Sequence, residues 1–263
     1  MELGLTGKVA LVTGANRGIG AAIAAELASE GMNLCLVARD SGLLEDVAHR
    51  LRRSASIEVH VVPADLRDPA AAADTVARAV QHLGRLDLLV NNAGATKRAD
   101  FFSLTDEDWQ DGFALKFHGY VRMTRAAWPH LCETGGSIVN IAGVGARAGS
   151  AEFTIGGAVN VAILNFTKAM ADIGIPLGVR VNAVNPGLIA TDRFTRNVER
   201  TMHNRGMTRD QALAFLIASH GTARVGRPEE IGALVAYLAS ARADFIQGSL
   251  IDIDGGATRS WSI

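Results

Sequence analysis

Residues 13–20 read TGANRGIG and join a short β-branched run, KVALVTG, to a helical pattern, AAIAAELASEG. Glycines in such a turn let the main chain approach a diphosphate. The amino terminus of the helix that follows offers free N–H groups and the positive end of its dipole. This context predicts a dinucleotide-binding strand–turn–helix unit. The alternative is a tight turn between strand and helix that binds no ligand.

The same alternation of strand and helix patterns continues along the chain. Further strand-like runs are NLCLVAR, IEVHVVPA, LDLLVNNAG, GSIVNIAG, GVRVNAVNPG and SLIDIDGG, and helical segments separate them. This order predicts an α/β fold, a doubly wound parallel sheet with helices on both faces. We expect one Rossmann-type domain over 1–263. The segment at about 189–223 breaks the alternation, and we expect this insertion to cap a substrate site.

Composition argues against several classes of protein. The chain has 263 residues, a formal net charge of −1 and 5% aromatic residues, so no basic or stacking surface for nucleic acid stands out. No uncharged apolar stretch reaches the length of about 18 residues that a membrane span needs. Cys35 and Cys132 are too far apart to suggest a metal knuckle or a disulfide framework. We therefore expect a cytoplasmic protein without a metal, a membrane partner or a nucleic-acid partner.

Four separated motifs carry a resemblance to a known family. TGANRGIG has the spacing T-G-x-x-x-G-x-G, and it is followed by NNAG at 91–94, NPGLIAT at 185–191, and GRPEEIG with IDIDGG near the end. In this order the motifs resemble the short-chain dehydrogenase/reductase family over nearly the whole chain. The resemblance implies a nicotinamide cofactor, a small-molecule substrate or ligand, and a homo-oligomer, either a tetramer or a dimer.

The resemblance also implies which residues hold the cofactor. Asn91, Ala93 and Gly94 would line the stretch from adenosine to nicotinamide, Asp65 with Leu66 would lie beside the adenine, and 186–191 would hold the carboxamide. The expected cofactor-binding residues are Gly14, Asn16, Arg17, Gly18, Ile19, Gly20, Arg39, Asp65, Leu66, Asn91, Ala93, Gly94, Pro186, Gly187, Ile189 and Thr191.

The charge at the end of the second strand bears on the choice of cofactor. An acidic residue there would bind the ribose 2′-hydroxyl of NAD(H), but the strand ends in Ala38 and Arg39, and Arg17 lies in the glycine loop. Two guanidinium groups are suited to a 2′-phosphate, which favours NADP(H) over NAD(H). The alternative is that Arg39 only solvates the strand end and Asp40 takes the hydroxyl.

The catalytic positions of the family are all substituted here. Its usual centre has a serine after the fifth strand, a tyrosine thirteen residues later, a lysine four residues further, and an asparagine on the preceding helix. Aligning the helix NFTKAMA puts Gly143 at the serine, Gly156 at the tyrosine and Asn160 at the lysine. Counting back from the GY of ALKFHGY puts Lys116 at the asparagine.

A different alignment does not restore the missing groups. Taking Phe153 as the tyrosine would place Gly157 at the lysine and would need a gap in the helix. In EFTIGGAVN, residues 152–160, the two glycines are expected to stand where the helix begins, and the helix is expected to run to about Met170.

The loss of these side chains should change the chemistry. The tyrosine donates a proton in ketone reduction, the serine stabilises the oxygen, and the lysine lowers the pKa of the tyrosine. Glycine supplies none of this, so ordinary tyrosine-dependent ketone reduction is disfavoured. We expect an atypical oxidoreductase with room at Gly143 and Gly156 for a water or for a partly apolar carbonyl or enoyl substrate. The alternative is a catalytically silent NADP(H)-binding sensor or structural subunit.

Lys116 and Asn160 have exchanged residue types relative to the family. The Lys116 ammonium is long enough to reach the cavity beside the cofactor ribose; the alternative is that it points to solvent or pairs with a carboxylate. His118 should face another side of the helix. Arg147 and Glu152 are expected to be solvated loop charges, with a position beside the substrate cavity as the alternative.

Apolar residues in the insertion bear on the ligand. Five of them lie among charges, which suggests a partly apolar ligand, although they are equally suited to packing the insertion onto itself: Phe194, Met202, Met207, Phe215 and Leu216.

Overall fold

A computed structural model describes residues 2–259, so the expected domain of 1–263 extends past the described residues at both ends. Seven parallel strands form one sheet in the order β3-β2-β1-β4-β5-β6-β7. The strands are β1 (Val9–Thr13), β2 (Asn33–Ala38), β3 (Val59–Pro63), β4 (Leu88–Asn91), β5 (Ser137–Ile141), β6 (Arg180–Pro186) and β7 (Leu250–Ile253). Each strand-like run of the sequence contains one of them, and the predicted doubly wound fold is confirmed.

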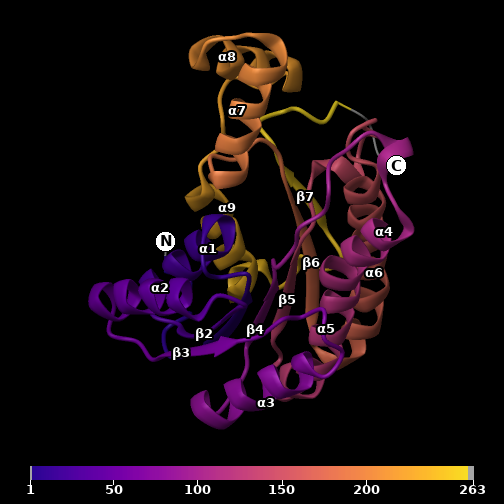
Figure 1. Cartoon of the computed structure of the whole chain (residues 1–263). Helices are drawn as coiled ribbons and strands as arrows, with labels where there is room; N and C mark the ends of the chain where they lie inside the picture. Colours follow the sequence, from indigo (N-terminus) through magenta and orange to yellow (C-terminus); the bar gives the residue numbers. More distant parts are fainter. Residues whose placement is uncertain (1, 260–263) are drawn as a thin grey trace.

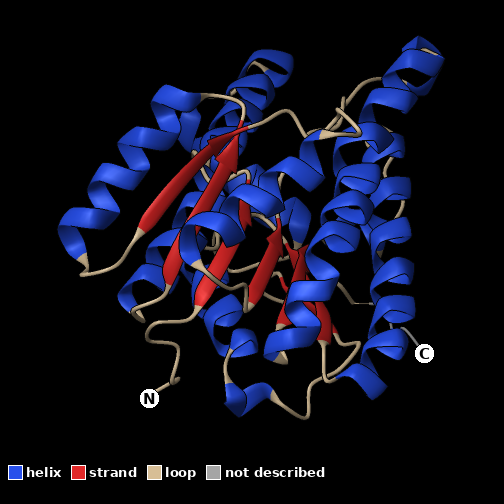
Figure 2. Cartoon of the chain, turned by 90° about the horizontal axis from the view of Figure 1, so that it is seen from below, coloured by secondary structure: helices blue, strands red, loops and turns tan. Residues whose placement is uncertain are grey.

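Helices cover both faces of the sheet (Figures 1 and 2). One face carries α1 (Gly18–Ser29), α2 (Ser41–Ser54) and α9 (Pro228–Ala239), and the other carries α3 (Ala71–Leu83), α4 (Asp106–Phe113), α5 (Gly119–Thr134) and α6 (Thr154–Gly174). The short 3-10 turns are η1 (Phe101–Ser103), η3 (Val144–Ala146), η4 (Ile175–Leu177) and η5 (Ala241–Ala243). The turn η2 (Ala114–His118) is π-helical and connects α4 to α5.

Alternation along β1 shows how the two layers of core arise. Ala10 and Val12 pack with α1, α2 and α9, whereas Val9 and Leu11 pack with α3 and α5. Successive side chains of a strand point to opposite faces, so a strand buried on both faces is apolar throughout.

The chain order reverses at β1, which pairs in parallel with both β2 and β4. In open α/β sheets, ligands bind outside the carboxyl ends of the strands at such a switch point. The loops that follow β1 and β4 therefore meet at one edge of the sheet, and these are the loops that contain TGANRGIG and NNAG.

Helix α6 differs from its prediction at both ends. It begins at Thr154 and ends at Gly174, so Gly156 and Gly157 lie in its first turn rather than before it. The Gly157 N–H donates to the Phe153 carbonyl over 2.8 Å. Ile155 and Val159 are fully buried on either side of the glycine pair. Packing of these residues outweighs the low helix propensity of glycine.

By length and composition alone, the segment Thr154–Leu177 would be able to cross a membrane, and it is the one such helix among residues 2–259. Ile155, Val159 and Ile163 on this helix are fully buried in the core that it forms with α4 and η2. This burial is typical of a helix that covers a sheet.

The insertion at 189–223 contains α7 (Asp192–Arg205) and α8 (Arg209–His220), which project together from the sheet (Figure 1). The two helices share a small core of their own. Its members include all five apolar residues that suggested a partly apolar ligand: Phe194, Met202, Met207, Phe215 and Leu216. These side chains pack the insertion onto itself, so they no longer support an apolar ligand.

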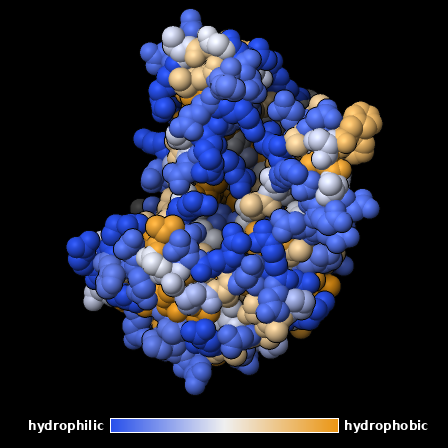
Figure 3. Space-filling view, viewed as in Figure 1, coloured by the Kyte–Doolittle hydropathy of each residue, from blue (hydrophilic) through white to orange (hydrophobic). Residues whose placement is uncertain are grey.

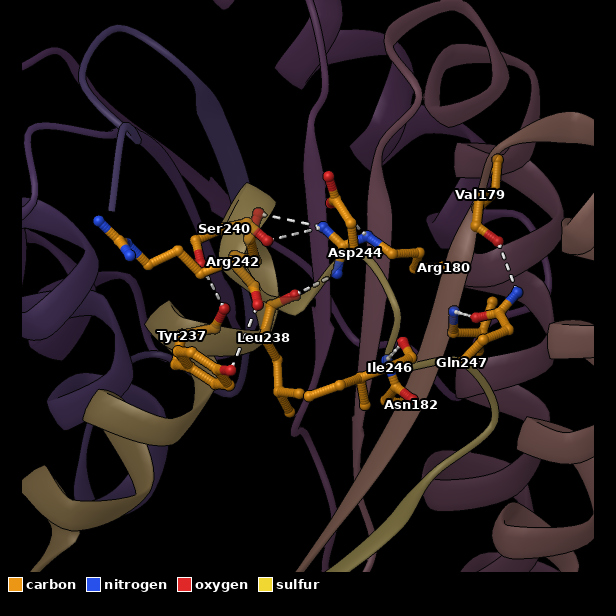
Figure 4. Close-up of polar contacts among 12 residues, drawn as sticks. Val179, Arg180, Asn182, Tyr237, Leu238, Ser240, Arg242, Asp244, Ile246 and Gln247 are labelled. Atoms are coloured by element: carbon orange, nitrogen blue, oxygen red, sulfur yellow. Dashed lines mark hydrogen bonds and ion pairs between the residues drawn. The ribbon is translucent and has the colours of Figure 1, made fainter. Parts of the chain in front are cut away.

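Polar contacts fix the position of β6 (Figure 4). The Arg180 guanidinium donates to the carbonyls of Leu238 and Ser240 and lies 3.5 Å from Asp244. The Asn182 amide donates to the Ile246 carbonyl over 2.9 Å. These hydrogen bonds hold β6 against the segment that leads into β7. They therefore fix the position of the end of β6, from which the segment after Pro186 continues.

Candidate functional site

The turn after β1 needs its glycines. Gly14 and Gly18 have φ angles of 67° and 56°, a region in which other residues are strained. A Cβ at Gly20 would overlap the carbonyl oxygen of Gly14. Arg17, which precedes α1, makes no side-chain capping hydrogen bond, so the first N–H groups of α1 face the turn without a side-chain acceptor. These features fit a diphosphate.

Thr13 and Asn92 join this turn to the loop after β4. The Thr13 hydroxyl accepts the N–H groups of Asn92 and Ala93 over 2.9 and 3.0 Å, and the Asn92 amide donates to the Thr13 carbonyl over 2.9 Å. A Cβ on Gly14 would lie only 2.9 Å from the Ala93 Cα. Neither residue was predicted from the sequence. The available signal was the alternation of side chains at the end of β4, since only one of the consecutive residues Asn91 and Asn92 can point into the sheet.

Asn91 is the inward member of that pair. Its side chain is fully buried, and its amide donates to Asn140 over 2.9 Å and to Thr124 over 3.3 Å. The Asn91 side chain therefore ties β4 to β5 and α5 rather than lining the surface of the site. Gly94, further along, lies against Lys116, since a Cβ at Gly94 would be 2.8 Å from the Lys116 Cδ.

Charged residues collect where β2 and β3 end. Arg39 is 66% exposed, and its guanidinium lies 3.9 Å from the Asp65 carboxylate. Asp65 also accepts the N–H of Arg67 over 3.0 Å, and Leu66 is buried beside it. The Asp40 carboxylate accepts the N–H of Leu43 over 3.0 Å and so caps α2. Of the remaining loop residues, Asn16 and Ile19 are half-buried and Arg17 is exposed.

The segment after β6 crosses to the glycine loop. The Gly187 N–H donates to the Ile253 carbonyl over 3.1 Å, and Ile189 pairs with Gly226. The Thr191 methyl lies 3.5 Å from the position of a Cβ at Gly18. The segment Pro186–Thr191 therefore lies next to the glycine turn TGANRGIG. One ligand could contact both segments only if they lie this close.

Lys116 and Asn160 contact each other directly. Lys116 lies in the π-helical turn η2, and its Nζ donates to the Asn160 Oδ1 over 2.7 Å and to the Ala142 carbonyl over 2.8 Å. Burial lowers the Lys116 pKa to about 7, with a smaller contribution from the positive charge of Arg193. The alternative in which Lys116 points to solvent or pairs with a carboxylate is wrong. A contact with a cofactor ribose stays a prediction.

The space expected at Gly156 is filled. A Cβ at Gly156 would overlap three atoms of the Phe153 ring, and one at Gly145 would lie 2.8 Å from the same ring. At Gly143, where φ is 149°, a Cβ would lie 3.2 Å from the Asn160 amide nitrogen. The predicted room for a water at Gly156 is therefore wrong, because an aromatic ring takes the volume of the missing side chain.

Three more charged residues surround this centre. The Arg98 guanidinium stands 3.9 Å above the centre of the Phe153 ring. Arg193, at the start of α7, donates to the Gly94 carbonyl over 2.9 Å. Arg147 is 13% exposed and lies 3.1 Å from the Asp252 carboxylate, and it lines a pocket of about 340 Å³ beside Phe153. The expectation that Arg147 is a solvated loop charge is wrong, while Glu152 and His118 are exposed as expected.

Within residues 2–259, no group of three or more His, Cys, Asp or Glu residues is arranged so that it could hold a metal ion.

Comparisons with known proteins agree on one family. A family model described as enoyl-(acyl carrier protein) reductase matches residues 14–258. The chain is 34% identical over 250 residues to the acetoacetyl-CoA reductase of Rhizobium meliloti (strain 1021), covering 95% of this chain and 98% of that protein. It is 33% identical over 256 residues to the meso-2,3-butanediol dehydrogenase of Serratia marcescens, covering 96% and 95%.

Among solved structures, the L-sorbose reductase of Gluconobacter frateurii, complexed with NADPH and L-sorbose, superposes with a TM-score of 0.95 and 31% identity. The match covers 99% of this chain and 100% of that one. Together with the glycine turn, the NNAG loop and the sheet order, these similarities show that the chain is an oxidoreductase-family protein: it belongs to the short-chain dehydrogenase/reductase family.

Proposed function

We propose that the chain is an NADP(H)-dependent reductase whose centre uses the Lys116–Asn160 pair in place of the family's tyrosine and lysine. The observation that carries this proposal is that the Lys116 Nζ donates to both the Asn160 amide oxygen and the Ala142 carbonyl. The sequence alignment assigns positions 116 and 160 to the family's catalytic asparagine and lysine. The substrate class that fits is a carbonyl or enoyl compound, with 189–223 as the cap.

The glycine turn and the converging loops support a dinucleotide cofactor, and the charges support NADP(H). Arg17 and Arg39 are both suited to a 2′-phosphate. Asp40, the competing ligand for a 2′-hydroxyl, already caps α2. When bound, NADPH supplies two electrons and one hydrogen to the carbon that is reduced.

Lys116 is suited to hold and move the accompanying proton at its Nζ. A neutral amine has two N–H groups, and two acceptors are present; an ammonium has a third N–H that remains for a substrate atom. With a pKa of about 7, both forms are populated near neutral pH, which is the condition for efficient proton transfer. Asn160 positions the amine and carries no proton itself.

The Phe153 ring favours a substrate that does not need a phenol. It fills the space beside Gly156, the position that the resemblance assigns to the tyrosine, so we expect ordinary tyrosine-dependent reduction of ketones to lack a donor there. An enoyl substrate takes hydrogen at carbon, and the matching family model is described as an enoyl reductase.

The test is NADPH oxidation over a panel of ketones, aldehydes and α,β-unsaturated thioesters, with Lys116→Met beside the parent. We expect Lys116→Met to lower kcat by about 10²–10⁴ because it removes the positioned acid. Lys168→Met, on the exposed side of α6, is the matched control and should turn over like the parent. Full activity of Lys116→Met would contradict the proposal.

The Phe153 ring also supports a second candidate, a silent NADP(H)-binding subunit or sensor. In that case the parent binds NADPH in calorimetry, no compound of the panel is turned over, and Lys116→Met changes nothing. These results together would replace the reductase proposal with the silent one.

We also propose a homo-oligomer, a dimer or tetramer, in the cytoplasm. Apolar residues are exposed along and after α6: Val161, Ile173, Ile175 and Leu177. Both cysteines, Cys35 and Cys132, are free, as in a reducing compartment. Light scattering after gel filtration tests the assembly, and a monomeric mass across concentrations would contradict it.

A further inference from the structure

Helix α7 has two faces of different character. Phe194, Val198 and Met202 pack against α8, and Arg205 lies over the Phe215 ring at 4.1 Å on the same side. Arg193, Arg196 and Arg200 follow a spacing of three and four residues, which places them together on the opposite face of the helix.

The arginine face of α7 looks toward the body of the molecule. Arg193 donates to the Gly94 carbonyl over 2.9 Å, at the loop that also contacts Lys116. Figure 3 shows the molecule hollowed between the α7–α8 projection and the body, and the α7 side of this hollow is hydrophilic.

Arg98 lies on the body side, close to the α7 arginines. Its guanidinium covers the Phe153 ring, next to the Gly156 position. Burial lowers the Arg98 pKa, and the positive charges of Arg200 and Arg193 lower it further. Burial likewise lowers the Arg193 pKa, with Arg196 as the next cause. The four arginines are thus close enough to repel one another.

Glu152 opposes part of this positive charge, since it raises the Arg98 pKa, but no carboxylate in the described part of the chain forms an ion pair with the group. Within residues 2–259, none of the four has a carboxylate oxygen within 4.0 Å of its guanidinium. All four residues are exposed, so water screens part of their repulsion, and an anion bound among them would stabilise the group further.

We propose that the site binds a small organic substrate through an anionic group, a carboxylate or a phosphate, which Arg98 grips from the body and Arg200 and Arg196 grip from α7. Guanidinium groups match both anions with paired N–H donors. In the proposed function the cofactor phosphates are bound by the glycine turn and Arg39, although Arg17 of that turn is close enough to lower the Arg193 pKa. Arg193 holds α7 in place through Gly94. The inference rests on the proposed function in placing this anion beside the reacting centre of a reductase.

The test measures anion binding without turnover. The protein is first titrated with NADP⁺, then the saturated protein is titrated with inorganic phosphate and, separately, with acetate, by calorimetry at low ionic strength. We expect saturable binding of at least one anion. Arg98→Gln and Arg200→Gln should each weaken it about five- to tenfold, the effect of losing one charge-assisted contact.

Arg205→Gln is the matched control, because it removes the same charge from the other face of the same helix. Its anion affinity should stay within about twofold of the parent. Equal losses in all three variants, or no saturable binding of either anion to the NADP⁺-saturated protein, would overturn the proposal. Failure of the first titration, with NADP⁺, would instead count against the proposed function. The affinities for phosphate and acetate then tell which anion the site prefers.

Discussion

The Phe153 ring gives Gly156 a testable energetic role. Gly156 lies in the first turn of α6, where alanine would be favoured by up to about 1 kcal/mol on helix propensity alone. A methyl group there would overlap the ring, and overpacking costs about 1–3 kcal/mol. We therefore expect Gly156→Ala to lower the free energy of unfolding by up to about 2 kcal/mol.

The sign should reverse when the ring is removed. Phe153→Ala alone should cost about 1.5–3 kcal/mol in lost burial and about 0.5–1 kcal/mol in the contact with Arg98. In that background the added methyl of Gly156→Ala has room, so the same change should stabilise the protein by up to about 1 kcal/mol. The two residues should thus be coupled by about 1–3 kcal/mol.

Urea unfolding of the parent, the two single variants and the double variant, at one protein concentration, measures this coupling. Gly42→Ala in α2 is the control, since its added Cβ would meet only the Asp40 carboxylate at 3.6 Å. It should have the same effect with and without Phe153. If Gly156→Ala also has the same effect in both backgrounds, the ring does not occupy the tyrosine position.

Three further predictions concern charge. The Lys116 pKa is about 7 when folded and 10.5 in the reference state, so between these values the unfolded chain binds the extra proton. The free energy of unfolding should therefore rise with pH above about pH 7, by at most about 1.4 kcal/mol per pH unit. In urea titrations, Lys116→Met should lack this rise. If the parent and Lys116→Met show the same dependence on pH, the low pKa of Lys116 is contradicted. Arg39→Ala should weaken NADPH binding about tenfold and NADH binding hardly at all, and equal losses in calorimetry would remove the 2′-phosphate argument. Lys116→Ala should weaken NADPH binding, and adding Asn160→Lys in that background should restore part of the loss. Asn160→Lys with Lys116 still present should bind NADPH more weakly, because two ammonium groups then compete for one cavity. If the effects of the two changes on the free energy of NADPH binding are simply additive, the exchange of residue types at 116 and 160 has no role in binding.

The fold was predictable because its signals are local. Strands buried on both faces read as apolar runs, and the order of strand and helix patterns defines the sheet. The glycine turn is local in the same sense. The first turn of α6 was misplaced because Ile155 and Val159 stabilise it through contacts that lie outside any short sequence window.

The candidate catalytic centre was less predictable because its contacts join distant residues. Lys116 and Asn160 are 44 residues apart, and their identities alone do not say that they touch. The position of the Phe153 ring depends on a side-chain conformation, which sequence spacing does not specify. The arginine face of α7 could have been predicted from the spacing of positions 193, 196 and 200. The prediction for this segment considered its apolar residues instead.

The position of the Phe153 ring between Gly145 and Gly156 also limits which substitutions this site can accept. A phenol cannot be placed at position 156 by one substitution, because the ring must be removed first, and its removal alone should lower stability. Position 160 presents the same obstacle, since a lysine there would meet the Lys116 ammonium while that residue remains. Each of the side chains that the family resemblance places here would thus be blocked by the present neighbour. Rebuilding that centre would therefore need paired substitutions, and the order in which they are made matters more than their number.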